Sequence, residues 1–191
     1  MLQGIQQRGG DSTGDALYGD TDGKHFIMRF NVGENVGEGS SSVMEDVSVY
    51  DERKKIVDET LRDLGAKIIK EERTLPYSLR YEISYDKKDL LDFSQKIESI
   101  PGVEILSMGK SLEVIKDLGN AKAVCDRYSL DKLVGTHAIG HARMATESGV
   151  DIKSAHPFWG YPFSDVSVVH NGQLTNYWNN RRSLENKGMR F

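Results

Sequence analysis

The chain has 191 residues, of which 38% are hydrophobic, and it carries a formal net charge of −4 at pH 7. This length suits one domain with a sizeable core, or one domain that carries an insertion, and the acidic balance gives no electrostatic reason to expect nucleic acid or an anionic membrane as a partner. No apolar run approaches the roughly 18 residues of a membrane span, and the N-terminus lacks a signal-peptide pattern, so we expect a cytoplasmic protein.

The first 42 residues predict the end of a helix, two strands and a loop. Residues 1–7 have a helical pattern without a cap, which suggests that the sequence starts inside a longer chain. Residues 16–18 and 24–30 are typical of strands, and the Asp22-Gly23 pair between them favours a hairpin turn. Residues 31–42 contain three glycines and a run of serines. We therefore expect a loop and a domain boundary there.

Residues 43–108 predict a subdomain of their own. Strands are expected at 43–50, 66–70, 79–85 and 103–106, and helices at 51–64 and 86–100, with Asp86 as the second cap. The alternation of Leu79, Tyr81 and Ile83 with polar residues marks a half-buried strand. The order βαββαβ predicts an inserted ferredoxin-like subdomain. It could be a ligand-sensing or docking module or a structural insertion, and we prefer the structural interpretation.

A short helix is expected after the subdomain, with Asn120 as its cap. Cys125 is the only cysteine in the chain, which excludes an internal disulfide and a cysteine-cluster metal site. A lone cysteine can also be a nucleophile. However, the spacing of Cys125 from Ala121, Val124 and Tyr128 places it on the buried stripe of the helix, which favours an inert core thiol.

The segment 135–172 gathers the polar groups that suit a site. Arg143 offers a fork of donors that matches a carboxylate, and Thr146 adds a hydroxyl as the chain leaves the strand. The β-branched run 166–169 leads to Asn171-Gly172, whose side-chain amide and backbone N–H could form an oxyanion hole. The alternative is structural, because Asn-Gly is also a strong hairpin-turn dipeptide.

Four histidines in this segment, at positions 137, 141, 156 and 170, raise the alternative of a metal-dependent hydrolase. His137 and His141 would share a face on a helix, but the flanking glycines and the β pattern favour a strand or turn. Residues four apart on a strand lie roughly 13 Å apart, too far to share a metal. We therefore expect no metal site there.

The C-terminal residues predict one more helix. Asn176 is expected to cap it, and Gly188 is expected to end it after Lys187. The last three residues have the pattern of a strand that is just beginning, so both ends of the chain look cut.

Four short motifs, taken together, resemble those of the class II glutamine amidotransferases, which are N-terminal-nucleophile hydrolases. They are Arg-Gly-x-Asp-Ser at 8–12, Gly-His-x-Arg-x-Ala-Thr at 140–146, Ala-His-Pro-Phe at 155–158 and His-Asn-Gly at 170–172. Residues 144–148 and 155–159 are most similar to the amidotransferase subunits related to glutamate synthase. The resemblance implies an α+β fold, an incomplete αββα sandwich formed by 1–42 and 109–191, with 43–108 inserted.

The resemblance also implies a reaction and a set of roles, and no cofactor. In the family an N-terminal cysteine hydrolyses glutamine through a thioester, and the ammonia passes to a partner synthase subunit or domain. Carried over to this chain, Arg143 would bind the α-carboxylate of glutamine, and Thr146 would place its backbone end. Asn171 and Gly172 would hold the oxyanion. His156 matches a family histidine with a positional role.

The chain departs from the family pattern in its nucleophile, because no cysteine precedes Cys125. The aspartate that pairs with the amino group of glutamine in the family also falls beyond the last residue. We therefore expect a chain truncated at both ends that does not hydrolyse glutamine alone. Two alternatives remain open: a catalytically inactive binding or regulatory subunit, and another acceptor branch such as amidophosphoribosyltransferase or glucosamine-phosphate synthase.

Overall fold

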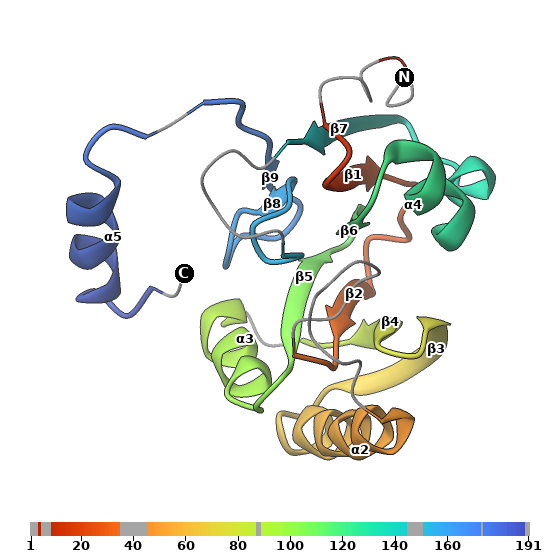
Figure 1. The fold of residues 1–191 in the computed structure, drawn as a ribbon. Coiled ribbons are helices and arrows are strands. Elements are labelled where there is room, and N and C mark those ends of the chain that lie inside the picture. The colour runs from red at the N-terminus through yellow and green to blue at the C-terminus, as the bar shows by residue number, and fades with distance from the viewer. Residues whose placement is uncertain are drawn as a thin grey trace.

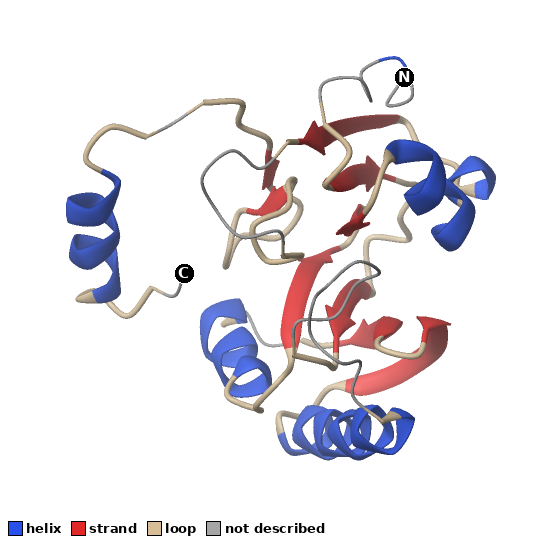
Figure 2. Ribbon diagram, in the orientation of Figure 1, coloured by secondary structure: helices blue, strands red, loops and turns tan. Residues whose placement is uncertain are grey.

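A computed structural model describes residues 4, 9–34, 46–86, 89–144, 151–172 and 174–189. In these ranges the chain forms antiparallel sheets flanked by helices (Figures 1 and 2). The elements are β1 (Ser12–Tyr18), β2 (Phe26–Asn31), α2 (Val47–Asp63), β3 (Lys67–Leu75), β4 (Ser78–Ser84), α3 (Leu90–Glu98), β5 (Glu104–Gly109), β6 (Leu112–Leu118), α4 (Ala121–Tyr128), the 3-10 helix η2 (Leu130–Lys132), β7 (His137–Arg143), β8 (Phe158–Trp159), β9 (Ser167–Val168) and α5 (Tyr177–Glu185).

The three-stranded sheet has the order β6-β1-β7, and its register determines which residues share a face. Ser12 of β1 lies opposite Arg143 of β7, and Gly14 lies between His141 of β7 and Lys116 of β6. Residues directly opposite one another on neighbouring strands point to the same face. Arg143, His141 and Lys116 therefore share one face of this sheet.

Different parts of the chain cover the two faces of the three-stranded sheet. Ile115, which alternates with Lys116 along β6, packs with Tyr128 of α4. The ammonium group of Lys116 instead donates a hydrogen bond to the carbonyl oxygen of Ala155. Since neighbouring residues on a strand point to opposite faces, α4 covers one face and the segment 151–172, which contains β8 and β9, lies over the other.

The four-stranded sheet has the order β3-β4-β2-β5, and each neighbouring pair is antiparallel. α2 and α3 lie together along one side of it (Figure 1). The run β2-α2-β3-β4-α3-β5 has the order βαββαβ. The sheet therefore includes β2 and extends across the boundary expected at residue 42, while the ferredoxin-like assignment stays a prediction.

The strand predicted at 43–50 is wrong over residues 47–50, which begin α2; residues 43–45 lie outside the described ranges. The carboxylate of Asp46 accepts a hydrogen bond from the backbone N–H of Ser48, which caps the helix. Tyr50 is buried on the same stripe as Val57 and Leu61. Tyr50 lies two helical turns before Val57, so it continues the apolar stripe of the helix toward the N-terminus. The helix therefore begins before residue 51, where it was predicted to start.

The predicted hairpin between β1 and β2 is also wrong, because the two strands belong to different sheets. The carboxylate of Asp22 accepts hydrogen bonds from the backbone N–H groups of Lys24 at 2.7 Å and His25 at 3.0 Å. Asp22-Gly23 therefore forms a local turn that carries the chain from one sheet to the other. The dipeptide signal predicts a turn but cannot fix which strands pair beside it.

Other elements keep their predicted places with corrections at their ends. α3 is capped by Asp89, whose carboxylate accepts from the N–H of Asp92, and not by Asp86. Asn120 caps α4 as predicted. Cys125 is only half-buried, so the prediction that it lies in the core is wrong. It lies beside the buried stripe of α4. Asn176 precedes α5 in the left-handed conformation without a side-chain cap hydrogen bond.

Strand β6 has no counterpart among the sequence predictions. Its residues are buried on both faces, from Leu112 and Val114 to Ile115 and Asp117. A strand covered on both sides lacks the period of two by which a half-buried strand is found. β5 continues into β6 through Lys110 and Ser111, and this connection leads from one large sheet to the other.

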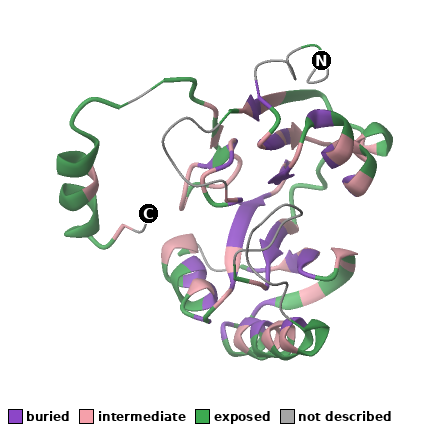
Figure 3. Cartoon of the chain, viewed as in Figure 1, coloured by how far each residue is buried: buried purple, intermediate pink, exposed green. Residues whose placement is uncertain are grey.

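One hydrophobic cluster includes residues of both large sheets, among them Ala16 of β1, Met28 of β2 and Leu79 of β4, each fully buried. Buried positions concentrate on the central strands, whereas α5 stands apart and is mostly exposed (Figures 1 and 3). None of the helices in the described part of the chain combines the length and apolar character needed to cross a bilayer.

Candidate functional site

Three histidines form a row over the face of the three-stranded sheet that carries Arg143. The rings of His141 and His156 stack with their centroids 4.8 Å apart. The backbone N–H of His170 donates to Nδ1 of His156 at 3.2 Å. Asn171 follows His170 directly in the chain. These contacts bring the end of β7 and the His-Asn-Gly motif to the two ends of one row.

The imidazoles of His141 and His156 are held in the neutral form. The pKa of His156 is lowered to about 4 by burial and by the basic groups around it, which disfavour a further positive charge: His141, Lys116, Arg143 and His170. Burial and Arg143 also lower the pKa of His141. Nδ1 of His156 accepts a hydrogen bond, so the neutral ring carries its proton on Nε2. The positive charge near the row therefore comes from Arg143 and Lys116, which suits an anionic group of a ligand.

Lys116 is a residue of this site that the sequence analysis missed. Its side chain is only 4% exposed. Its ammonium donates to the carbonyl oxygens of Lys153 at 3.2 Å and Ala155 at 3.1 Å, and it lies 5.2 Å from the centre of the Phe158 ring. Lys116 therefore fixes the Ala-His-Pro-Phe motif to the sheet. A lysine in the middle of an apolar run was the available signal.

The sheet and the motif above it approach each other most closely at Gly14. A β-carbon at this position would lie 2.2 Å from the carbonyl oxygen of His156 and 3.0 Å from Cδ of Pro157. No side chain fits in that space. Glycine at position 14 thus sets how close the motif lies to the sheet.

Two further contacts anchor the segment that leads to His170. The carboxylate of Asp165 accepts hydrogen bonds from the backbone N–H groups of Ser111 at 2.7 Å and Leu112 at 2.9 Å. The hydroxyl groups of Tyr18 and Ser167 lie 2.8 Å apart and share a hydrogen bond. β9, which delivers His170, is therefore tied both to β1 and to the turn between β5 and β6.

The N-terminal motif lies beside the end of β7. The backbone N–H of Asp11 donates to the carbonyl oxygen of Arg143 at 3.2 Å. A β-carbon at Gly9 would lie 2.2 Å from the carbonyl carbon of Arg143, so the two backbones are in close contact. Two motifs that lie far apart in the sequence thus meet at Arg143; Arg8 lies outside the described residues.

The predicted site residues differ in their exposure, and one of them lies outside the described residues. Arg143 is half-buried on the row's face, and the adjacent Met144 is 57% exposed. Asn171 and Gly172 are exposed after β9. Thr146 lies outside the described residues. The roles assigned to these residues stay predictions.

The positions of the histidine rings test the alternative of a metal-dependent hydrolase. β7 is a strand, as expected, and His137 lies away from the row, stacked on Tyr18 at a centroid distance of 4.4 Å. His141 and His156 face each other through their ring planes. Stacked rings direct their nitrogens outward around the ring edges and not toward a shared ion, so this arrangement does not favour a metal.

Comparison with known proteins finds relatives that bear glutamine amidotransferase names. One, from Methanothermobacter thermautotrophicus and provisionally named a glutamine amidotransferase, is 37% identical over the whole chain. The glutamine amidotransferase-like protein GlxB of Rhizobium meliloti is 33% identical, also over the whole chain. The chain spans 60% and 57% of the lengths of these two proteins.

A third relative matches only part of the chain. Amidophosphoribosyltransferase 2 of Arabidopsis thaliana is 40% identical over 47% of this chain and 16% of its own length. No protein-family model matches the chain. The chain therefore has glutamine amidotransferase-like homologues along its whole length, with a partial match to an amidophosphoribosyltransferase.

Proposed function

We propose that this chain forms the glutamine-binding part of a class II glutamine amidotransferase domain, which hydrolyses glutamine to glutamate and ammonia for a partner synthase. The observation that carries the proposal is the meeting of the N-terminal motif with Arg143, on the sheet face that carries the stacked imidazoles of His141 and His156. Relatives with glutamine amidotransferase names match the whole chain, which supports the same function.

The chemistry of the face fits one end of glutamine. A guanidinium group pairs with a carboxylate through two parallel hydrogen bonds, so Arg143 would bind the α-carboxylate of the substrate. Thr146 would place the adjacent backbone end. His156, neutral and hydrogen-bonded to the backbone of His170, would position the motif and not transfer protons. Asn171 and Gly172 would donate hydrogen bonds to the oxyanion of the tetrahedral intermediate.

The nucleophile would come from a cysteine ahead of the N-terminal motif in the mature polypeptide. Cys125, the only thiol in the sequence, belongs to α4. That helix covers the face of the three-stranded sheet opposite to Arg143, so Cys125 is unsuited to attack a glutamine held there. A polypeptide of these 191 residues would then bind glutamine without releasing ammonia.

We favour a glutamate-synthase-like acceptor of the ammonia, on the motifs at 144–148 and 155–159. The alternative is a catalytically inactive binding or regulatory subunit. The N-terminal sequence and intact mass of the native protein separate the two. A mature chain that begins with cysteine supports the enzyme, and replacing Asn171 with Ala should then slow ammonia release by about a hundredfold to a thousandfold.

Binding of L-glutamine to this chain tests the proposal directly by calorimetry. We expect Arg143→Gln to weaken binding by at least about tenfold, because a hydrogen-bonded charge pair is lost. Arg62→Gln, an exposed position at the end of α2, serves as the matched control and should leave the affinity unchanged.

A second ligand tests separately the contribution of the α-carboxylate of glutamine to binding. 4-Aminobutanamide is glutamine without its α-carboxylate, so it should bind the unaltered chain weakly and respond little to Arg143→Gln. Equal binding of L-glutamine to the unaltered chain and to Arg143→Gln, or its failure to bind the unaltered chain, would contradict the proposal.

A further inference from the structure

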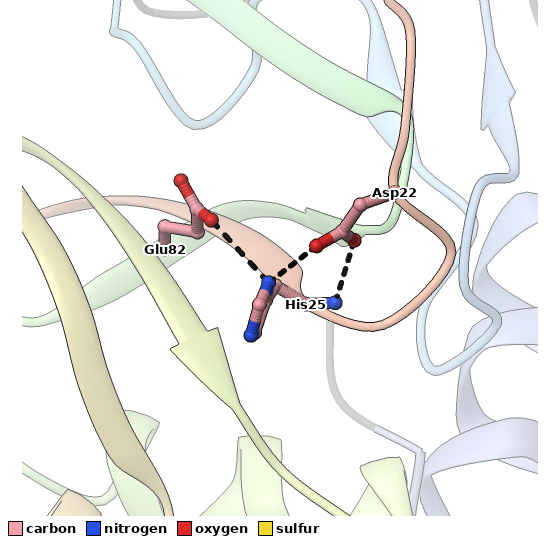
Figure 4. A group of neighbouring side chains, drawn as sticks. All are labelled: Asp22, His25 and Glu82. Atoms are coloured by element: carbon pink, nitrogen blue, oxygen red, sulfur yellow. Dashed lines mark hydrogen bonds and ion pairs between the residues drawn. The ribbon is translucent and has the colours of Figure 1, made fainter.

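A second cluster of polar groups lies away from the row of histidines, where the connection from β1 enters β2. Asp22 and His25 come from this connection, and Glu82 comes from β4 (Figure 4). Nδ1 of His25 lies 2.6 Å from a carboxylate oxygen of Asp22 and 3.5 Å from one of Glu82. One atom from each of the three groups lies within 4.8 Å of the others.

We propose that Asp22, His25 and Glu82 bind a divalent transition-metal ion of the zinc class. One imidazole nitrogen and two carboxylate oxygens form a ligand set that Zn²⁺ accepts, with bonds of about 2.0–2.2 Å. Ligand atoms around such an ion lie about 3 to 4 Å apart. The present distances therefore need only small side-chain shifts, with the ion replacing the proton between His25 and Asp22.

The backbone holds two of the three ligands in place before any ion arrives. One oxygen of Asp22 accepts hydrogen bonds from the N–H groups of Lys24 and His25, which leaves the other oxygen directed at the imidazole. Glu82 projects from β4, where it lies opposite Ile27 of β2. The ligands thus sit on a turn and a strand that the sheet already joins, which lowers the entropic cost of ordering them.

The surroundings leave room for a further ligand on the ion. A cavity of about 640 Å³ is lined by His25 and, among other residues, by Lys24, Tyr85, Asp86 and Lys110. Three protein ligands leave a tetrahedral ion one open position, which water can occupy. The two lysines oppose a cation, whereas the two carboxylates of the triad together favour it.

Binding at this point would join two parts of the fold. The ion would tie the connection between the two large sheets to β4, in the middle of the four-stranded sheet. Zinc should therefore raise the melting temperature, since a ligand that binds the folded state alone stabilises it.

Calorimetric titration of the chelator-treated chain with ZnCl₂ tests the proposal. We expect one Zn²⁺ per chain at this site, with MgCl₂ binding far more weakly because Mg²⁺ prefers oxygen ligands alone. Asp22→Asn, His25→Gln and Glu82→Gln should each weaken zinc binding by about tenfold or more, since loss of outer-shell partners alone costs that much elsewhere. The asparagine side chain in Asp22→Asn can still accept the hydrogen bonds of the turn through its amide oxygen, so that variant should fold.

Two control variants make the test specific. Asp86→Asn removes an acidic group from the cavity lining without touching the triad, and His156→Gln disrupts the other group of histidines; both should keep the zinc affinity. In the unaltered chain, zinc should also shift the NMR signals of the His25 ring. The proposal is overturned if the affinity survives His25→Gln and Glu82→Gln, if it is lost in His156→Gln, or if no zinc binds.

Discussion

Gly14 is the residue at which the sheet and the Ala-His-Pro-Phe motif come closest. The methyl group of Gly14→Ala would lie 2.2 Å from the carbonyl oxygen of His156, a backbone atom that cannot rotate away. We expect a loss of about 1–3 kcal/mol of unfolding free energy and weaker glutamine binding, because the motif must move. Urea denaturation and calorimetry measure the two effects.

Gly10→Ala is the matched control for this substitution. A β-carbon at Gly10 meets no atom within 4 Å, and the position lies in the same N-terminal stretch. It should leave the stability within about 0.5 kcal/mol of the unaltered chain, as surface substitutions usually do. If the two variants lose equal stability, the close approach at Gly14 is not what matters.

The lowered pKa of His156 predicts how the free energy of unfolding depends on pH. Its pKa is lowered from the ordinary 6.5 to about 4 in the folded chain. Between these two values the unfolded chain binds more protons than the folded one. The free energy of unfolding should therefore fall as the pH drops from about 6.5 toward 4, whereas above about 6.5 the contribution of His156 is constant.

The variant His156→Gln removes this titration and keeps the carboxylates that also respond to acid. Urea unfolding at about pH 7 and at about pH 4.5 should thus show a smaller loss of stability in His156→Gln than in the unaltered chain. Equal losses in the two proteins would mean that His156 titrates normally.

Single residues also show what a sequence can predict about a site. Arg143 and His156 stand out because their motifs place polar groups at the ends of apolar runs. Lys116 stands in an equally apolar run, but its role depends on the segment 151–172 lying over β6. That contact joins residues far apart in the chain, and no local pattern records it.

At the scale of the elements, Asp165 holds the connection that leads into β9. Its carboxylate accepts hydrogen bonds from the N–H groups of Ser111 and Leu112, and these bonds lower its pKa against the effect of burial. Asp165→Ala leaves both N–H groups without this partner. We expect about 1–3 kcal/mol of lost stability.

Hydrogen exchange localises the effect of Asp165→Ala. Protection should fall at the amides of Ser111 and Leu112 and along β9, while the amides of α2 should keep theirs at matched global stability. Asp151→Ala is the comparison, because Asp151 makes its hydrogen bonds within its own turn, to Ser154. Unchanged exchange at residues 111 and 112 would contradict the proposed anchor.

The elements that the sequence predicts best are those with local signals. Leu79, Tyr81 and Ile83 alternate with polar residues and are all fully buried in β4. Asn120 caps α4 because a side-chain oxygen can satisfy the first N–H groups of a helix. In contrast, Asp22-Gly23 fixes a turn but not the partners of the flanking strands, so the predicted hairpin fails.

At the scale of the whole molecule, β2 shows why the domain boundary was difficult to predict. The Gly/Ser-rich stretch at 31–42 separates β2 from α2 in the sequence, which favours a boundary there. β2 nonetheless pairs with β4 and β5, so it belongs with the later strands. Strands pair according to the side chains that they bury together. A stretch rich in glycine and serine can therefore connect two elements of the same sheet.

Asp117 ties the two large sheets together. It is fully buried in β6, and its carboxylate accepts hydrogen bonds from Tyr77 at 2.9 Å, between β3 and β4, and from Arg127 of α4 at 2.7 Å. Burial and this carboxylate raise the pKa of Tyr77, so the phenol remains a donor at physiological pH. Three separate parts of the fold thus share one buried charge.

Asp117→Asn keeps the shape of the side chain and removes its charge, which leaves Arg127 without its buried counter-ion at this position. We expect a loss of about 3–5 kcal/mol, because breaking a buried pair exposes the cost of desolvating the remaining charge. Asp126→Asn, on the same helix α4 as Arg127, breaks an exposed pair with Lys122 and should change stability by less than about 1 kcal/mol.

The position of Asp117 between the sheets predicts more than a lower stability. Trp159 belongs to the hydrophobic cluster that includes residues of both large sheets, so its fluorescence reports on the packing between them, whereas far-UV circular dichroism reports on all sheets and helices. In the unaltered chain both signals should change together in urea, as expected for one cooperative core. In Asp117→Asn the fluorescence of Trp159 should change at a lower urea concentration than the dichroism. Coincident transitions in that variant would show that the hydrophobic core alone couples the sheets.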